Sequence, residues 1–142
     1  MTKSLVVDAS FAFRLVVPGS QQPLCETLMD QWSHKGYDLC APTLWAYEIT
    51  SALCKVIRFG GLEKDEGWRA LTQAQGMDMR LVPPDSTQMR AAFEWTARLN
   101  RAAAYDSFYL ALAEALDCDL WTADRRLFNA ANKPWVHCVG EM

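Results

Sequence analysis

Four acidic side chains stand where the chain changes its character or interrupts an apolar stretch. Asp8 ends the apolar run SLVV, Asp124 ends the segment DLWTA, and Asp106 opens the apolar segment SFYLALAEAL. Glu48 lies inside a fourth apolar stretch, LWAYEITSAL. Several carboxylates in a small space repel one another and favour a bound cation. An oxygen-only donor set without His or Cys is typical of Mg²⁺ or Mn²⁺ sites.

Each acid also has a simpler explanation when it is considered alone. Asp8, Asp106 and Asp124 stand at expected helix starts, where a carboxylate caps free N–H groups and suits the helix dipole. Glu48 could pair with a Lys or Arg, or lie half-exposed on its helix. A shared site is favoured only if the fold brings the four acids together.

The order of apolar segments predicts a fold that does so. Runs typical of strands lie at 4–7, 37–41, 80–82, 119–123 and 135–139, and segments with helical spacing alternate with them. This alternation predicts a parallel sheet covered by helices on both faces. In such sheets ligands bind beyond the carboxyl ends of the strands, where Asp8 and Asp124 stand. We therefore expect one domain over residues 1–142, a three-layer α/β/α fold with five parallel strands.

Two helices are expected to carry the other two acids. Thr43 is a candidate N-cap for a helix that contains Glu48 and ends at Gly60 and Gly61. The helix around Asp106 should bury one face, because apolar residues recur there at three- and four-residue spacing. The residues of this face are Tyr105, Phe108, Tyr109, Leu112 and Leu116.

Two hydroxyl side chains flank the expected site. Ser10 is two residues after Asp8, and Thr122 is two residues before Asp124 on the same side of its strand. Either hydroxyl could orient a water molecule on a metal ion, or be an ordinary helix cap or strand residue. Asp119 does not qualify, because about 3.3 Å per residue places it roughly 16 Å from Asp124, at the wrong end of the sheet.

Composition limits the class of protein further. The chain has 142 residues and a net charge of −3, which does not suggest a nucleic-acid binder but leaves room for local basic patches. No apolar run approaches the roughly 20 residues of a membrane span, and the first residues lack a signal-peptide pattern. Five scattered Cys without a CxxC pair and only two His indicate a cytoplasmic protein without a disulfide frame, zinc site or His-based triad.

Taken together, the acidic segments resemble the PIN domain, and in particular its VapC type, the toxin of bacterial and archaeal toxin–antitoxin pairs. The matching segments are LVVDAS, APTLWAYEITSAL, YDSFYLALAEAL and LWTADRRL, in the family's order and over nearly the whole chain. The resemblance implies Mg²⁺-dependent endoribonuclease activity, a homodimer, and an antitoxin that lies across the active-site groove. By position, Asp8 and Asp106 match the family's principal metal-binding acids, and Glu48 and Asp124 match the other two.

This quartet suggests a mechanism. Asp8 and Asp106 would hold Mg²⁺, or Mn²⁺ in its place, and Glu48 and Asp124 would complete the site or bind a second ion through water. Water activated by the metal would attack the RNA phosphodiester in line. Because this attack does not need the RNA 2′-OH, we expect products with 5′-phosphates.

Basic side chains near the acids are candidates for holding RNA phosphates. Arg125 and Arg126 directly follow Asp124, although a solvated face explains this pair equally well. The other candidates lie near Glu48 or Asp106, and they are Lys55, Arg58, Arg98 and Arg101.

Two other classes of function are considered. A Mg²⁺-dependent phosphatase would use a strand-end Asp as nucleophile, but Ser10 stands where such enzymes usually carry a second acid. A phospho-receiver domain would need a suitably placed Lys, and none is obvious. A PIN scaffold that binds RNA or protein without cleavage would be indicated by loss of an acid, and none of the four is missing.

Overall fold

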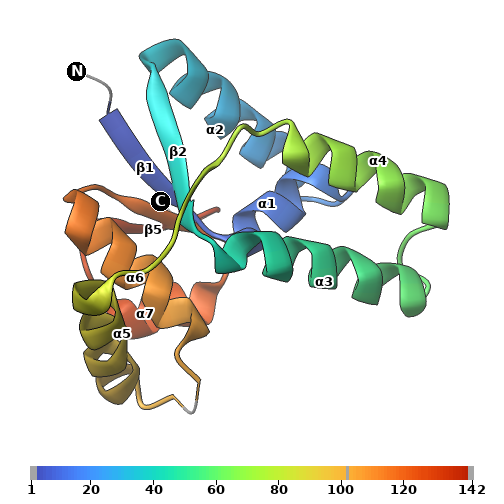
Figure 1. Cartoon of the computed structure of the whole chain (residues 1–142). Coiled ribbons are helices and arrows are strands. Elements are labelled where there is room, and N and C mark those ends of the chain that lie inside the picture. The colour runs from blue at the N-terminus through green and yellow to red at the C-terminus, as the bar shows by residue number, and fades with distance from the viewer. Residues whose placement is uncertain (1–2, 102, 141–142) are drawn as a thin grey trace.

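A single parallel sheet forms the centre of the molecule. The computed structural model describes residues 3–101 and 103–140, and within them five strands form one sheet in the order β3-β2-β1-β4-β5 (Figure 1). Every neighbouring pair is parallel. The strands are β1 (Lys3–Val7), β2 (Tyr37–Pro42), β3 (Arg80–Val82), β4 (Leu120–Thr122) and β5 (Val136–Cys138).

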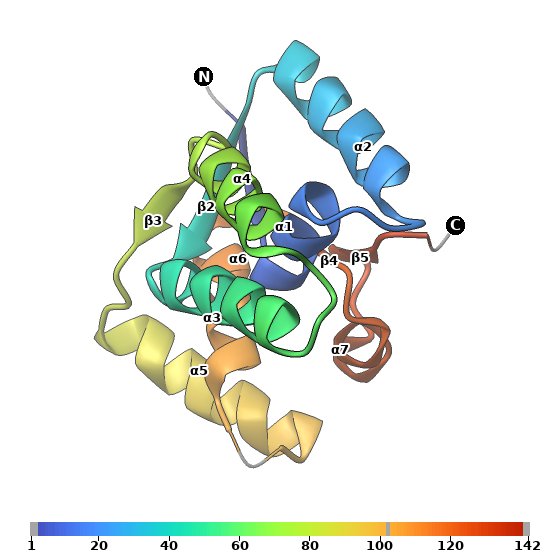
Figure 2. The same ribbon diagram turned by 90° about the vertical axis from the view of Figure 1, so that its right-hand side faces the viewer.

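Helices cover both faces of this sheet. The described part of the chain contains seven: α1 (Ala9–Val16), α2 (Gln22–Lys35), α3 (Leu44–Arg58), α4 (Lys64–Gln75), α5 (Ser86–Leu99), α6 (Tyr105–Leu116) and α7 (Arg125–Ala131). α6 packs on β1, β2 and β4 with α5 against it, whereas α1 contacts β4 and α2 contacts β2 from the other side. Figure 2 is seen from the side of α1 to α4 and shows α6 behind them. The expected three-layer α/β/α fold is confirmed. None of the helices described is long and apolar enough to cross a membrane.

The buried core is centred on β1 and α6. Val6 and Val7 are fully buried because β1 is the middle strand, and α6 buries Tyr109 and Leu112. The prediction was wrong for Tyr105, which is 66% exposed. It is the first residue of α6, and the buried residues of this helix begin only at its third residue.

Thr43 stands at the start of α3 as expected but does not cap the helix. Its backbone is already helical (φ −56°, ψ −26°), and its side chain accepts no capping hydrogen bond. A capping side chain needs an extended backbone to reach back to the free N–H groups. The Thr43 N–H instead donates to the Val82 carbonyl (3.2 Å), which ties the start of α3 to the end of β3.

The strand order creates a topological switch point between β1 and β4. From β1 the chain moves outward to β2 and β3, and it later returns to β4 on the other side of β1. Val7 pairs with Trp121, and the Asp8 N–H donates to the Trp121 carbonyl (3.1 Å). Open α/β sheets bind ligands at such a point. The topology therefore brings together the residues that follow these two strands.

Candidate active site

The four acids that the sequence singles out line one cleft at this switch point. The cleft has a volume of about 820 Å³, and Asp8, Glu48, Asp106 and Asp124 all contribute to its wall. Asp8 and Asp124 are the N-cap residues of α1 and α7, Glu48 projects from α3, and Asp106 belongs to the first turn of α6. Capping and a shared site are therefore compatible for Asp8 and Asp124, because both explanations fit the same position.

Asp8 is the most deeply buried of the four. Its Oδ1 accepts hydrogen bonds from the Phe11 N–H (3.0 Å) and the Ser10 hydroxyl (2.6 Å). The residue is 4% exposed. Burial raises the pKa of its carboxyl from 3.8 to about 6, although hydrogen bonds from Ser10, Thr122 and the Phe11 N–H act in the opposite direction. Its negative charge is therefore unfavourable unless a proton or a cation neutralises it.

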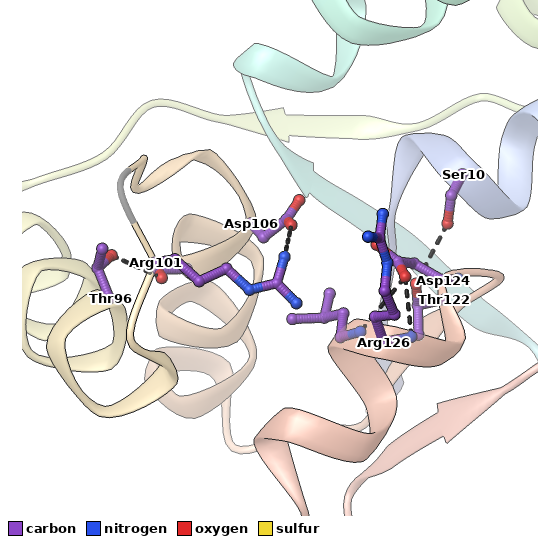
Figure 3. A network of polar contacts seen from close by, with 9 residues as sticks. Ser10, Thr96, Arg101, Asp106, Thr122, Asp124 and Arg126 are labelled. Carbon is purple, nitrogen blue, oxygen red and sulfur yellow. Dashed lines mark hydrogen bonds and ion pairs between the residues drawn. The ribbon is translucent and has the colours of Figure 1, made fainter.

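The hydroxyls of Ser10 and Thr122 join the ends of β1 and β4. The two oxygens lie 3.2 Å apart, and Ser10 Oγ accepts a hydrogen bond from the Ala123 N–H (2.9 Å). Thr122 Oγ1 accepts from the Asp124 N–H (3.0 Å). Figure 3 shows Ser10 pointing from α1 toward the loop that follows β4. Ser10 lines the cleft but Thr122 is fully buried outside it, so the bonding of both hydroxyls indicates that they position Asp8 and Asp124.

Asp106 interacts electrostatically with Asp124 and with the nearby arginines Arg101 and Arg126. Asp124 Oδ1 accepts from the backbone N–H groups of Arg126 (3.0 Å) and Leu127 (3.3 Å). Asp106 Oδ2 accepts from Arg101 Nη1 (3.2 Å), whose side chain reaches across from the loop after α5 (Figure 3). Burial and then the charge of Asp124 raise the pKa of the Asp106 carboxyl, while Arg101 and Arg126 lower it.

Glu48 has a buried hydroxyl as its partner. The Tyr109 hydroxyl donates to Glu48 Oε1 (2.6 Å), and Tyr109 lies almost fully inside the core. Burial raises the pKa of the Glu48 carboxyl, the bond from Tyr109 lowers it, and the charge of Asp106 raises it again. Sequence analysis counted Tyr109 only as a core residue. The available signal was a polar hydroxyl on the inward face of α6, three residues after Asp106.

The six basic candidates separate into two groups. Lys55, Arg125 and Arg126 line the cleft. Arg101 binds Asp106 instead, and Arg98 stacks over the Trp95 ring at 4.0 Å. The remaining candidate, Arg58, is exposed on α3 away from the cleft, whereas Arg14, which the sequence analysis did not propose, lines it.

The four acids suit a divalent cation by chemistry. All four donors are carboxylates, the oxygen ligands that Mg²⁺ and Mn²⁺ prefer. Asp8, Glu48 and Asp106 have raised pKa values because burial and neighbouring carboxylates oppose their negative charge. A cation would relieve this repulsion. The acids converge on one cleft without forming a closed cage: across residues 3–101 and 103–140, no three His, Cys, Asp or Glu side chains are gathered closely enough to hold an ion.

Comparison with known proteins identifies the family. The model of the PIN domain matches residues 5–133. The chain is 38% identical to Ribonuclease VapC9 of Mycobacterium tuberculosis over 123 residues, which are 87% of each protein. It is 32% identical to Ribonuclease VapC3 of Pyrobaculum aerophilum over 124 residues, or 87% of this chain and 91% of the relative. A solved toxin–antitoxin complex from Klebsiella pneumoniae shares the fold, with a TM-score of 0.70, 12% identity, and coverage of 97% of this chain and 99% of the other. The chain belongs to the PIN domain family.

Proposed function

We propose that this protein is a Mg²⁺-dependent endoribonuclease of the VapC type. The observation that carries the proposal is the convergence of four carboxylates in one cleft, three of them in surroundings that disfavour their charge. Relatives that match most of the chain are ribonucleases by name. A phosphatase with Asp8 as nucleophile is not supported, because the Ser10 hydroxyl binds Asp8 Oδ1 where such an enzyme needs a second acid.

In this proposal each acid has a defined role. Asp8 and Asp106 hold Mg²⁺, or Mn²⁺ in its place, and Glu48 and Asp124 complete the surroundings of the ion. A bound cation would lower the pKa of water enough to supply hydroxide for attack on a phosphodiester at neutral pH, and it would stabilise the charge on the leaving oxygen. Tyr109 holds Glu48 toward the cleft through its hydrogen bond.

The basic side chains of the cleft are proposed to bind the RNA substrate. Arg125 and Arg126 lie at its wall next to Asp124, where they can bind phosphate oxygens on either side of the scissile bond. Their charge compensates locally for a chain whose total charge is −3. Because the attacking group is water, the 2′-OH is not consumed and the products carry 5′-phosphates.

Partner proteins follow from the same family context. The Klebsiella pneumoniae neighbour was solved as a toxin–antitoxin complex. We infer that this chain is the toxin of such a pair, acts on RNA in the cytoplasm, forms a homodimer and is inhibited by an antitoxin. Large exposed apolar side chains provide surface for these contacts, among them Tyr47, Trp68 and Phe93.

The decisive experiment is cleavage of total RNA by the purified protein, freed of any co-purified partner, with Mg²⁺, Mn²⁺ or EDTA. Asp106→Asn is compared with Asp65→Asn, because each acid is the second residue of its helix, α6 or α4. Wild type and Asp65→Asn should give discrete, metal-dependent fragments with 5′-phosphates, and Asp106→Asn should give none.

Other outcomes would change the conclusion. An Asp106→Asn protein that folds and still cleaves at the wild-type rate would contradict the assignment of the acids. A wild-type protein that neither cleaves RNA nor binds Mn²⁺ would instead support a PIN scaffold without catalytic activity. Binding of Mn²⁺ without cleavage would direct the search to a specific RNA or a retained inhibitor.

A further inference from the structure

A second, smaller cavity opens directly beside the cleft that holds the four acids. This side pocket has a volume of about 350 Å³ and is bounded by Arg14, Ala123 and the segment that joins α1 to α2. We propose that the side pocket binds a phosphate group of the RNA strand other than the one that is cleaved. The inference rests on the proposed ribonuclease function and adds a second anchoring point for its substrate.

The side pocket and the cleft share part of their walls. Arg14 and Ala123 line both cavities. Ala123 directly precedes Asp124, so the side pocket begins one residue, or about 3.8 Å between Cα atoms, from an acid of the cleft. Figure 2 shows the segment between α1 and α2 passing beside β4 and β5. A strand with its scissile phosphate at the acids can therefore place a nearby phosphate in the side pocket.

The two cavities differ in the charge of their walls. Of the residues that the structure describes, four carboxylates line the cleft and none lines the side pocket. The side pocket instead contains the Arg14 guanidinium, which forms no ion pair with a carboxylate in the described part of the chain. The electrostatics therefore favour a cation in the cleft and an anion in the side pocket.

Uncharged hydrogen-bonding groups line the side pocket next to this arginine. Ser20, Gln21 and Gln22 bring a hydroxyl and two amides to its wall. The segment that carries them is fixed at Gln22, whose side-chain amide donates to the Leu15 carbonyl (3.0 Å) and whose N–H donates to the Gly19 carbonyl (3.2 Å). Arginine, serine and glutamine side chains are typical partners of phosphate oxygens in nucleic-acid-binding proteins.

This wall suits a phosphate better than a base or a metal ion. Stacking of a base requires an aromatic side chain, and none of the described residues of the side pocket is aromatic. A divalent cation would require carboxylates, which this wall lacks among the same residues. An RNA phosphate offers acceptor oxygens to the guanidinium and to the neutral donors. The side pocket would therefore hold the strand by its backbone without reading its sequence.

The test measures binding of a fluorescently labelled single-stranded RNA of mixed sequence at several salt concentrations. All proteins carry Asp106→Asn so that the probe stays intact. Arg14→Met should weaken binding several-fold and reduce the slope of log affinity against log salt by about 0.7, the contribution of one phosphate contact to a single strand. Gln21→Glu places a carboxylate in the side pocket with little change in size, and it should weaken binding at least as much.

Two matched variants control for the change in total charge. Arg58→Met removes an exposed cation of α3, and Gln75→Glu adds a carboxylate at an exposed residue of α4. Neither residue lines the cleft or the side pocket, so both variants should keep the affinity and the salt dependence of the parent protein.

A second readout separates binding in the side pocket from damage to the acids. With Asp106 intact, Gln21→Glu should bind Mn²⁺ with wild-type affinity, because the side pocket contains none of the four acids. On an RNA that wild type cleaves, Gln21→Glu should act mainly by raising KM, since a phosphate away from the scissile bond is bound equally well in the ground state and the transition state.

Three outcomes would contradict the proposals in different ways. If Arg14→Met and Gln21→Glu bind RNA as their controls do, the side pocket does not bind a phosphate, and the ribonuclease proposal survives if wild type still cleaves RNA. If only Arg14→Met weakens binding, Arg14 acts from the cleft and the side pocket is again excluded. A wild-type protein that neither binds nor cleaves any RNA would overturn both proposals.

Discussion

The strand-end acids, Asp8 and Asp124, both accept hydrogen bonds from backbone N–H groups, and Asp8 also accepts one from the Ser10 hydroxyl. The helix acids, Glu48 and Asp106, are each held by one side chain. Backbone N–H groups at the starts of α1 and α7 donate to the strand-end acids. A tyrosine hydroxyl and an arginine hold the helix acids. The strand-end acids are therefore positioned by backbone contacts at the ends of β1 and β4, with a hydroxyl added at Asp8, whereas each helix acid depends on a single side chain.

The largest effect is expected at Asp8, because burial of this carboxylate disfavours its charged form. Asp8→Asn should raise the free energy of unfolding at neutral pH by up to about 3 kcal/mol, the cost that corresponds to a pKa raised from 3.8 to about 6. Folded Asp8 keeps its proton up to about pH 6, while the unfolded chain releases it near 3.8, so wild-type stability falls as pH rises between these values. Urea unfolding without metal, at about pH 4 and about pH 7, measures this.

The amide should fill the structural role of Asp8, since Asn caps helices as well as Asp does. Asp85→Asn is the control. Asp85 also caps its helix by accepting a hydrogen bond from a backbone N–H (2.8 Å), but its side chain is exposed to solvent. The prediction fails if Asp8→Asn shows the same dependence of stability on pH as wild type. Added Mg²⁺ should stabilise wild type more than Asp8→Asn.

Ser10→Ala should disturb the strand-end acids without changing any carboxylate. It removes the hydroxyl that donates to Asp8 Oδ1 and accepts from the Ala123 N–H. Loss of a group that supports a metal ligand typically costs about 10- to 100-fold, which we expect in both Mn²⁺ affinity and cleavage. Ser51→Ala, at an exposed serine of α3, should change neither. Wild-type Mn²⁺ affinity in Ser10→Ala would show that the main chain alone fixes these acids.

Tyr109→Phe tests the helix acid Glu48 in the same way. The change removes the hydroxyl bond (2.6 Å) and should reduce cleavage by about tenfold. Because that bond lowers the pKa of the Glu48 carboxyl, its loss should raise the pKa and move the acid limb of the pH–rate profile to higher pH. Tyr47→Phe is the control, at a residue next to Glu48 that is 75% exposed. An unchanged pH profile in Tyr109→Phe would speak against a role for Glu48 in the reaction.

The smallest effect is expected at Asp106. Arg101→Met removes a cation that competes with a metal ion for this carboxylate, so Mn²⁺ should bind a few-fold more tightly. Calorimetric titration of the free protein measures the change. Arg98→Met is the control, since Arg98 stacks on Trp95. Weaker Mn²⁺ binding in Arg101→Met would mean that Arg101 orients Asp106 and does not compete for it.

The same contrast explains what could be predicted from the sequence. A strand that ends in an acid is a local pattern, and it correctly indicated where Asp8 and Asp124 stand in the fold. Which side chain supports a helix acid depends on how the helix is rotated against its neighbours. Tyr109 was therefore predicted only as a core residue, because a buried ring fits the apolar spacing of the helix whether or not its hydroxyl has a partner.

Basic residues were harder to assign for the same reason. Arg98 and Arg101 are three positions apart, yet one stacks on a tryptophan and the other binds Asp106. Arg14 and Phe59 reach the cleft through the packing of α1 against α3, which no local spacing encodes. The parallel sheet and the meeting of its strand ends were predictable from the alternation of elements, while the strand order and the groups that surround the acids required the tertiary structure.

Hydrogen bonds join Ser10 to Thr122 and Ala123, at the end of β4, which lie 112 and 113 positions further along the chain. The first strand is therefore synthesised long before the strand that completes the cleft beside it. A nascent chain that ends before Asp124 cannot assemble all four acids. Pairing β4 with β1 also closes a long loop, which is a slow step in folding. A growing chain therefore cannot assemble the four-acid cleft until β4 and Asp124 have emerged and docked against β1.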